Sequence, residues 1–288
     1  MALDSLPGVG GFVPSAFPKS SNCRIAFLGE APGEDEENVG VPFVGSSGQM
    51  LNGILASVGI DRRECYVGNV FSYRPDGNNL EVFCFPTGTK MPEVKKAYAE
   101  WIHVSGQPEH PLLAWGITAL AKGKFVRPEW LTELERIQSE LAQVNPTVVV
   151  ALGNTACWAL QRNPRIGTIR GTVLPGILTP HKVLPTYHPA FILRNYTQKV
   201  VVMADLMKAR QESLSPEIVY PERAIMLEPT RSDLGYIEAT ILCRSGPLAF
   251  DIETKHGCIL CISLCRDPKF TVTIPFVDRT KPQFAYWP

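Results

Sequence analysis

The chain has 288 residues, and its 28 basic and 28 acidic side chains cancel to a formal net charge of +0. Hydrophobic residues make up 45% of the sequence, which is ordinary for a soluble protein with a sizeable core. An apolar run of about 18 residues does not occur, which excludes a membrane span. Residues 1–18 lack the basic and apolar regions of a secretion signal. Eight scattered cysteines are typical of reduced thiols, and so we expect a cytoplasmic protein.

Strands alternate with helices along the first two thirds of the chain. Residues 1–22, rich in Gly, Pro and Ser, are expected to form an irregular lead-in. The hydrophobic pattern predicts strands over residues 24–28, 65–70, 147–152 and 182–187, and helices over residues 50–58, 92–103, 111–121 and 128–144. The pattern weakens between about residues 76 and 128, which we interpret as an insertion. The alternation predicts an α/β fold, a doubly wound parallel sheet flanked by helices, over residues 23–213.

The sequence changes character after residue 213. Three prolines lie in the polar stretch 214–232, which predicts a linker between domains. Strands are then predicted over residues 248–253, 258–265 and 270–276. We expect residues 233–288 to form an incomplete β-rich segment without covering helices.

Charge is unevenly distributed despite the neutral total. Eight Lys and Arg residues lie between residues 160 and 210, where Asp205 is the one acidic residue, while acidic residues crowd the stretch 30–37. Contacts with DNA phosphates need local positive charge of this kind. Solvated faces of either sign explain the charges equally well, so the motifs must decide.

Three motif loops follow predicted strands. Gly29-Glu-Ala-Pro-Gly33 is a tight turn that a ligand can approach closely. The amide of Asn69 can pair with both a carbonyl oxygen and an N–H group, and a neutral His188 can donate a hydrogen bond. Ligands of doubly wound sheets bind at the carboxyl ends of the strands, where all three loops fall. We therefore expect one composite site.

Four segments together resemble the uracil-DNA glycosylase superfamily, and most closely its family 4. They are Gly29–Gly33, Gly40–Gly45, Asn69 with Arg74-Pro75, and His188–Ala190 with Arg194, with Val148–Gly153 and Ile169–Gly171 as further landmarks. The resemblance covers roughly residues 23–212. It implies an enzyme that flips a uracil base out of DNA and hydrolyses its N-glycosidic bond, which leaves an abasic site.

The resemblance also implies residue roles. Glu30, Asn69 and His188 would be catalytic, with Asn69 reading the uracil edge and His188 binding the oxygen of the leaving base. Gly29, Ala31, Pro32, Gly33, Glu36, Phe43 and Asn78 would bind the substrate, with Phe43 stacking on uracil and the acids lying by the scissile bond or uracil C5. Pro189, Ala190 and Arg194 would press into the DNA. Ala31 replaces the water-activating Asp of the best-known branch, a substitution that family 4 tolerates.

Most of the cysteines that bind the iron–sulfur cluster of family 4 are missing from this sequence. The family usually holds an iron–sulfur cluster on four cysteines, two of them in an N-terminal Cys-x-x-Cys. This chain has only Cys23 near its start, Tyr73 at the third expected position, and no cysteine in the helix from Pro128. We expect a glycosylase domain without cluster or other cofactor, in which the insertion takes over the structural role.

A second resemblance concerns Phe250-Asp-Ile-Glu253, which is similar to the first acidic motif of the 3′–5′ exonuclease domain of family A DNA polymerases. Asp251 and Glu253 face the same side of a strand, as shared ligation of divalent metals requires. The further acids of such a site are missing. We therefore expect a truncated exonuclease-like segment over 233–288, with Mg²⁺ or Mn²⁺ bound only in a complete domain.

Three functions remain open at this point. The first is a uracil-DNA glycosylase, the second a non-catalytic uracil- or DNA-binding module of a replication polymerase, viral for example, and the third a nuclease fragment. Uracil-containing DNA is the expected partner, and replication proteins are the further partners that the exonuclease resemblance suggests. We expect a monomer, without membrane contact, in a bacterial or virus-infected bacterial cell.

Overall fold

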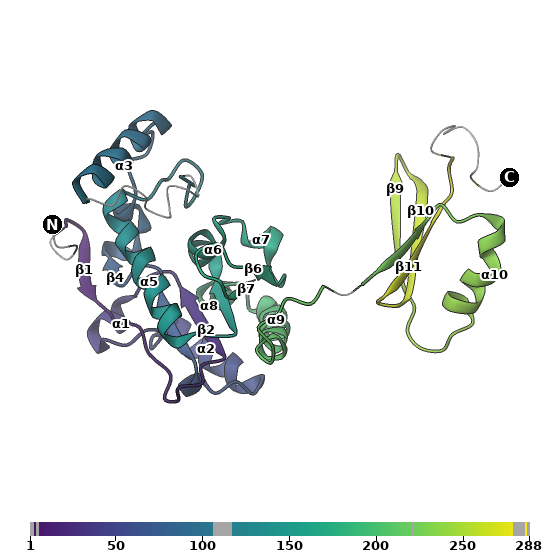
Figure 1. Cartoon of the computed structure of the whole chain (residues 1–288), viewed down its shortest axis with the longest axis horizontal. Helices are drawn as coiled ribbons and strands as arrows, with labels where there is room; N and C mark the ends of the chain where they lie inside the picture. Colours follow the sequence, from purple (N-terminus) through teal and green to yellow (C-terminus); the bar gives the residue numbers. More distant parts are fainter. Residues whose placement is uncertain (1–2, 4–5, 106–116, 221, 279–285, 287–288) are drawn as a thin grey trace. The chain divides into compact units, whose positions relative to one another are not determined.

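The computed structural model describes the chain except for residues 1–2, 4–5, 106–116, 221, 279–285 and 287–288 (Figure 1). The chain divides into two units, Met1–Ile218 and Val219–Pro288, which are taken separately below. None of the helices within the described ranges has the length and apolar character needed to cross a membrane.

A five-stranded sheet with the strand order β3-β2-β5-β7-β6 forms the centre of the first unit. The strands are β2 (Ile25–Gly29), β3 (Tyr66–Asn69), β5 (Val148–Leu152), β6 (Leu174–Pro175) and β7 (Lys182–Thr186). All are parallel except the two-residue β6, which pairs antiparallel with β7. Every residue of the four parallel strands is buried, which explains their continuous apolar sequences. The predicted α/β fold with a parallel sheet is confirmed.

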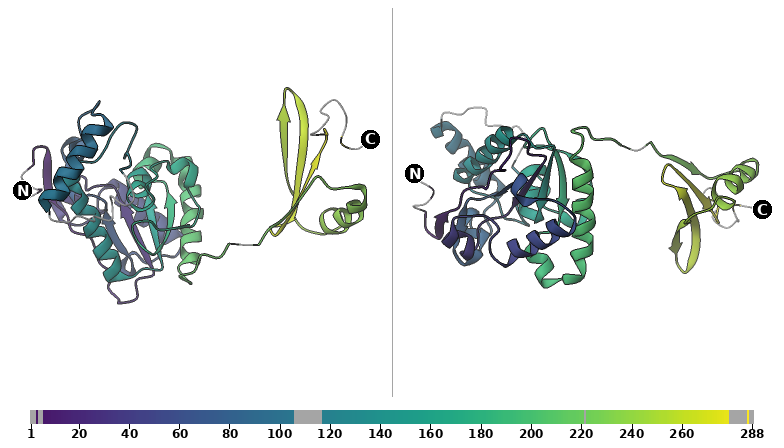
Figure 2. Two further views of the ribbon diagram at one scale, coloured as in Figure 1. Left: turned by 45° about the horizontal axis from the view of Figure 1, so that its top comes forward. Right: turned by 90° about the horizontal axis from the view of Figure 1, so that it is seen from below.

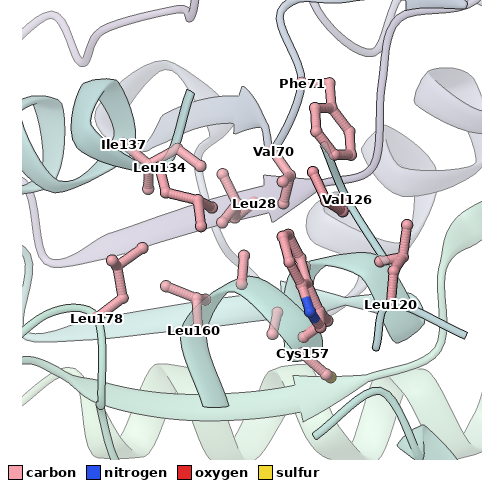
Figure 3. Packing of buried hydrophobic residues seen from close by; sticks show 14 of the residues in the cluster. Leu28, Val70, Phe71, Leu120, Val126, Leu134, Ile137, Cys157, Leu160 and Leu178 are labelled. Carbon is pink, nitrogen blue, oxygen red and sulfur yellow. The ribbon is translucent and has the colours of Figure 1, made fainter. Parts of the chain in front are cut away.

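Helices cover both faces of this sheet (Figure 2). Helices α5 (Leu131–Val144) and α6 (Gly153–Gln161) contribute to the core on one face, and α2 (Ser46–Ser57), α8 (Pro189–Arg194) and α9 (Lys199–Glu212) to the core on the other. Alternate residues of each strand enter alternate cores. In the first core, Leu28 and Val70 share a cluster with Leu134, Ile137 and Leu160 (Figure 3).

The first unit has further short elements around this framework. They are β1 (Val9–Phe12), β4 (Tyr73–Pro75), α1 (Glu34–Val39), α3 (Met91–Ser105), α7 (Ile166–Ile169) and 3₁₀ turns at Arg62–Glu64, Asp76–Asn78, Leu80–Phe83, Pro128–Trp130 and Tyr196–Gln198. Elements α1, β4 and α7 and the turns at Asp76–Asn78 and Leu80–Phe83 contribute residues to the candidate site.

Within the predicted irregular lead-in, residues 1–22, two described parts pair with distant strands. Strand β1 pairs antiparallel with β4, and the ring of Phe12 lies against that of Tyr73 with centroids 5.3 Å apart. Ala16 forms an antiparallel bridge with Val67 of β3. Glycine content predicts turns, but pairing with distant strands decides the conformation here.

The insertion over residues 76–128 contributes to the first core. Phe83, Val94, Tyr98 and Val126 are buried there, and the Tyr98 hydroxyl donates to the carbonyl oxygen of Val126 at 2.8 Å. The helix predicted over 111–121 lies mostly outside the described residues. Its described part, 117–121, is not helical.

The second unit contains a four-stranded sheet with the order β8-β11-β10-β9. The strands are β8 (Ala224–Leu227), β9 (Ala249–Lys255), β10 (Cys258–Asp267) and β11 (Phe270–Pro275). The three C-terminal strands agree with the prediction. The predicted linker 214–232 is shorter than expected, because β8 lies within it and pairs in parallel with β11.

A helical segment also covers part of this second sheet, contrary to expectation. Helix α10 (Leu234–Ile237) continues into a π-helical turn, Glu238–Leu242. Ile237 and Ile241 lie four residues apart, on one face, and are buried against Val272 of β11. Two apolar positions in so short a segment are too weak a pattern to predict a helix.

Candidate active site

A cleft of about 590 Å³ lies at the carboxyl ends of the parallel strands. Its lining includes the predicted residues Glu30, Ala31, Pro32, Gly33, Glu36, Phe43, Asn69, Asn78, His188, Ala190 and Arg194. Gly29 and Pro189, which were also predicted, do not line it. The loops after β2, β3, β5 and β7 therefore converge, as expected for ligand sites of doubly wound sheets.

Gly29 leaves room for two side chains of the cleft. A Cβ atom at this position would stand 2.4 Å from Cζ of Phe43 and 2.5 Å from Oδ1 of Asn69. Both distances are far inside van der Waals contact, so any larger residue must displace both side chains. Gly29 therefore acts by its small size beneath the cleft.

The loop that carries Phe43 is held in a strained conformation. Phe43 has a φ of 56°, which is uncommon for a residue other than glycine, and its side chain is buried. Arg62 donates to the carbonyl oxygens of Phe43 at 2.7 Å and Pro42 at 2.5 Å. These two hydrogen bonds hold the Phe43 backbone in place from outside the loop.

Glu36 fixes the same loop from the inside. One carboxylate oxygen accepts from the backbone N–H groups of Val44 at 3.0 Å and Gly45 at 2.9 Å, and the other accepts from Gly33 at 3.0 Å. Glu36 is buried and borders the cleft. With both oxygens engaged by backbone donors, its carboxylate organises the loops of Gly33 and Phe43.

Asn69 ends strand β3 and is 6% exposed. Its backbone carbonyl oxygen accepts from Nη2 of Arg136 at 2.7 Å. Its side-chain amide lines the cleft and makes no hydrogen bond with any residue of the described ranges. The amide thus offers both a donor and an acceptor to a ligand.

His188 caps the N-terminus of α8. Its Nδ1 atom accepts from the backbone N–H of Ala190 at 3.1 Å, so a neutral imidazole carries its proton on Nε2. Burial and, to a smaller extent, the positive charge of Arg194 lower the pKa of His188 to about 4. Gly153, with a φ of +87°, makes room for this side chain, because a Cβ there would stand 3.0 Å from Cβ of His188. At neutral pH His188 is therefore an uncharged donor.

Glu30 lies at the exit of β2 and is half-buried. The hydroxyl of Thr155 on α6 donates to its carboxylate at 2.5 Å. Burial raises the pKa of Glu30, and the hydrogen bond from Thr155 and the charge of Arg194 oppose that shift. A carboxylate with a raised pKa is a better proton acceptor than an exposed one.

Comparison with known proteins decides the family. Residues 16–210 match the model of the uracil DNA glycosylase superfamily. The chain belongs to the uracil-DNA glycosylase superfamily. It is 31% identical over 191 residues to the type-4 uracil-DNA glycosylase of Thermotoga maritima, covering 65% of this chain and 76% of that protein. It is 26% identical over 217 residues to the type-4 uracil-DNA glycosylase of Saccharolobus solfataricus, covering 72% of this chain and 80% of that protein. It is 24% identical over 220 residues to the type-4 uracil-DNA glycosylase of Sulfurisphaera tokodaii, covering 74% of this chain and 77% of that protein.

Several residues of this glycosylase-superfamily site were not singled out as site residues from the sequence. Ser47, Pro75, Leu80, Gly153, Asn154, Ile166, Tyr187 and Phe191 also line the cleft. Gly153 could have been found, because it follows a buried strand as Gly29 does. Arg62 and Thr155 act through contacts with residues far away in the chain, for which the local sequence carries no signal.

The iron–sulfur cluster that the superfamily's type 4 implies does not fit the residues present. Tyr73, at the third expected cysteine, packs against Phe12 and against Trp130, with ring centroids 5.9 Å apart for the second pair. Within the described ranges no group of three or more His, Cys, Asp or Glu side chains is placed to hold a metal ion. Aromatic side chains fill the place where a metal ligand is expected.

Asp251 and Glu253 lie in the second unit, on strand β9. They pair with Ser263 and Cys261 of β10 and are exposed. As alternate residues they share one face of the strand. They belong to no group of three metal-ligating side chains within the described ranges.

Proposed function

We propose that this chain is a uracil-DNA glycosylase, which takes uracil out of the DNA stack and hydrolyses its N-glycosidic bond to leave an abasic site. One observation carries the proposal. The free amide of Asn69, the neutral imidazole of His188 and the ring of Phe43 converge on a single cleft at the strand ends. A flipped base needs these three features, namely edge hydrogen bonds, a donor to the leaving oxygen, and an aromatic face.

The base is held by shape and by hydrogen bonds. The amide of Asn69 pairs with a carbonyl oxygen and an N–H group of uracil, and Phe43 offers its ring to the face of the base. As the bond between C1′ and N1 breaks, its electron pair passes to uracil, whose oxygen becomes negative. Nε2–H of His188 donates to that oxygen, and such a donor, fixed in advance by the cap on α8, lowers the barrier.

The sugar left behind becomes oxocarbenium-like and is attacked at C1′ by water. A carboxylate near this centre stabilises the positive charge, by analogy with glycoside hydrolysis. Glu30 is the candidate, since it borders the cleft and its pKa is raised by burial. In this proposal Glu30 also accepts the proton that the attacking water loses. Ala31 leaves the neighbouring position without a carboxylate.

Uracil-containing DNA is the proposed partner of the surface around α8. Arg194 is exposed at the last position of this helix, and Ala190 borders the cleft. Positive charge beside the cleft favours contact with the phosphate backbone. Pro189, at the first helical position, fixes the turn that would press into the DNA.

Base release separates a glycosylase from a binding module. We would incubate the protein with single- and double-stranded oligonucleotides that contain one uracil, in the presence of a chelator, and cleave abasic sites with alkali. The expected result is cleavage at the uracil position on at least one strand form. Tight binding without base release on either form would instead support the non-catalytic module.

For the second unit we propose an exonuclease-like role in a replication context, with replication proteins as further partners. The shared face of Asp251 and Glu253 on β9 favours this reading, because paired carboxylates can hold divalent metals. Since no third carboxylate joins them in the described ranges, we expect this chain alone to degrade no DNA. Release of nucleotides from a 3′ end in Mg²⁺ or Mn²⁺, abolished by Asp251→Asn, would contradict that expectation.

A further inference from the structure

A partly buried ion cluster lies on helix α5 and contacts the end of the strand that carries Asn69. Arg136 bridges Glu133, one turn earlier, at 3.2 Å and Glu140, one turn later, at 2.8 Å. The side chains of the three residues are 17%, 5% and 19% exposed, respectively. Charges withdrawn from water are costly unless they are paired, so Arg136 depends on both carboxylates and each carboxylate depends on Arg136.

The cluster binds the exit of β3 directly. Nη2 of Arg136 donates to the carbonyl oxygens of Asn69 at 2.7 Å and Val70 at 3.3 Å. The backbone N–H of Ser72 donates to Glu133 at 2.6 Å. Strand β3 is at the edge of the five-stranded sheet, so its outer backbone groups receive no strand partner there beyond the bridge at Val67. The ion cluster supplies the missing hydrogen bonds at the residue that reads the base.

The other end of the cluster reaches the N-terminal segment. Glu140 accepts from the hydroxyl of Ser15 at 2.8 Å and from the hydroxyl of Tyr66 at 2.6 Å. Three parts of the chain are thus joined: the N-terminal segment, β3 with the turn after it, and α5.

We propose that Arg136 is a positioning residue for Asn69, and that its ion cluster with Glu133 and Glu140 fixes the end of β3. This inference rests on the proposed uracil site. The side chain of Asn69 can bind the edge of uracil only if its backbone keeps a fixed position relative to Gly29, its partner in the neighbouring strand. Arg136 fixes that position through its hydrogen bond to the Asn69 carbonyl oxygen.

The test uses Arg136→Lys in the full chain. Lysine retains a positive charge for Glu133 and Glu140 but lacks the planar fork that also reaches Asn69. We expect a roughly tenfold to hundredfold loss in the single-turnover rate of uracil excision, as misplacement of a reactive group causes. The excision rate should fall, while the affinity for DNA without uracil should stay at the wild-type value. When Arg136→Lys is added to Asn69→Ala, the excision rate should fall almost no further. When Arg136→Lys is added to His188→Ala, the two rate losses should multiply.

Lys182→Met is the matched control. Lys182 is 3% exposed and donates to Glu212 and to the carbonyl oxygen of Glu217, at the far end of β7 from the cleft. Lys182→Met should lower the melting temperature, and its effect on the excision rate should be the same with and without Asn69→Ala. A wild-type excision rate in Arg136→Lys would overturn the inference. So would rate losses that multiply when Arg136→Lys is combined with Asn69→Ala. A rate loss in Arg136→Lys that is explained by its lower melting temperature would overturn it as well.

Binding to uracil-containing DNA provides a second readout that needs no catalysis. If the wild-type protein binds but excises nothing, the proposed function fails, and the same coupling between Arg136 and Asn69 should appear in the dissociation constants. Additive effects on binding would then overturn the inference separately. A wild-type protein that neither binds nor excises uracil would overturn both.

Discussion

Gly29 and Phe43 approach each other so closely that a Cβ atom on residue 29 would stand 2.4 Å from Cζ of Phe43. The same atom would stand 2.5 Å from Oδ1 of Asn69. In Gly29→Ala both side chains must move, at an overpacking cost of about 1–3 kcal/mol in stability. We expect the rate of uracil excision to fall by about tenfold to a hundredfold, measured in single turnover with saturating enzyme.

Gly53→Ala is the control for this substitution. Gly53 is exposed in the middle of α2, and a Cβ there meets no atom within 4 Å. Alanine should stabilise the helix by roughly 0.5–1 kcal/mol and leave excision unchanged. Equal activity of the two alanine variants would show that the space above Gly29 does not shape the site.

The pKa of His188 gives the enzyme a predictable response to acid. Burial, reinforced by Arg194, lowers this pKa to about 4, whereas an unfolded histidine titrates near about 6.5. Between these values the unfolded state binds the proton and the folded state does not. The contribution of neutral His188 to the free energy of unfolding is therefore fully present above about pH 6.5 and is lost as the pH falls toward 4.

In the folded protein, excision should decline along an acid limb near the lowered pKa of His188, about 4, because a proton on Nδ1 breaks the hydrogen bond from Ala190. Arg194→Gln removes a charge that lowers the pKa values of both His188 and Glu30. The acid limb of the single-turnover rate should then move to higher pH. A limb in the same place as in the wild type would argue against His188 and Glu30 as its origin.

The purified protein should be colourless. Tyr73 and its aromatic neighbours stand where a cysteine ligand is expected, and so we predict no broad visible absorbance and no stoichiometric iron. A chelator should not slow uracil excision. Visible absorbance together with iron at a fixed ratio to protein would show that other residues hold a cluster.

Residues 219–288 should be dispensable for excision. Every residue that lines the cleft belongs to the unit Met1–Ile218. A chain ending at Ile218 retains the carbonyl oxygen of Glu217, which accepts from the buried Lys182. Its single-turnover rate should equal that of the full chain. Loss of excision in a truncated protein with an unchanged melting temperature would place part of the second unit in the active site.

The parallel sheet and its helices α2 and α5 could be predicted from the sequence, whereas α9 was not predicted. Strands such as Val148–Leu152 are buried on both faces and therefore appear as continuous apolar runs. The convergence of Asn69 and His188 also followed, because the carboxyl ends of parallel strands meet at one edge. These features depend on local pattern and on a general property of the fold.

Features that depend on distant contacts could not be predicted. Strand β1 exists because it pairs with β4, and α10 because Ile237 and Ile241 cover Val272. Glu36 borders the cleft, but the sequence did not indicate that both of its oxygens also accept from backbone N–H groups. Arg136 reaches Asn69 across 67 positions of the sequence. No periodicity in a single sequence reports such a pair.

The central claim is that Asn69 and His188 together hold and activate a flipped uracil. Its most direct test is the single-turnover excision rate of Asn69→Ala and His188→Ala beside the wild type, with folding checked by melting temperature. Each variant loses one preorganised hydrogen bond, which by analogy with oxyanion-hole donors is worth roughly 2–4 kcal/mol in the transition state. Both variants should fold, and their rates should fall about thirtyfold to a thousandfold. Wild-type rates in either variant would contradict it.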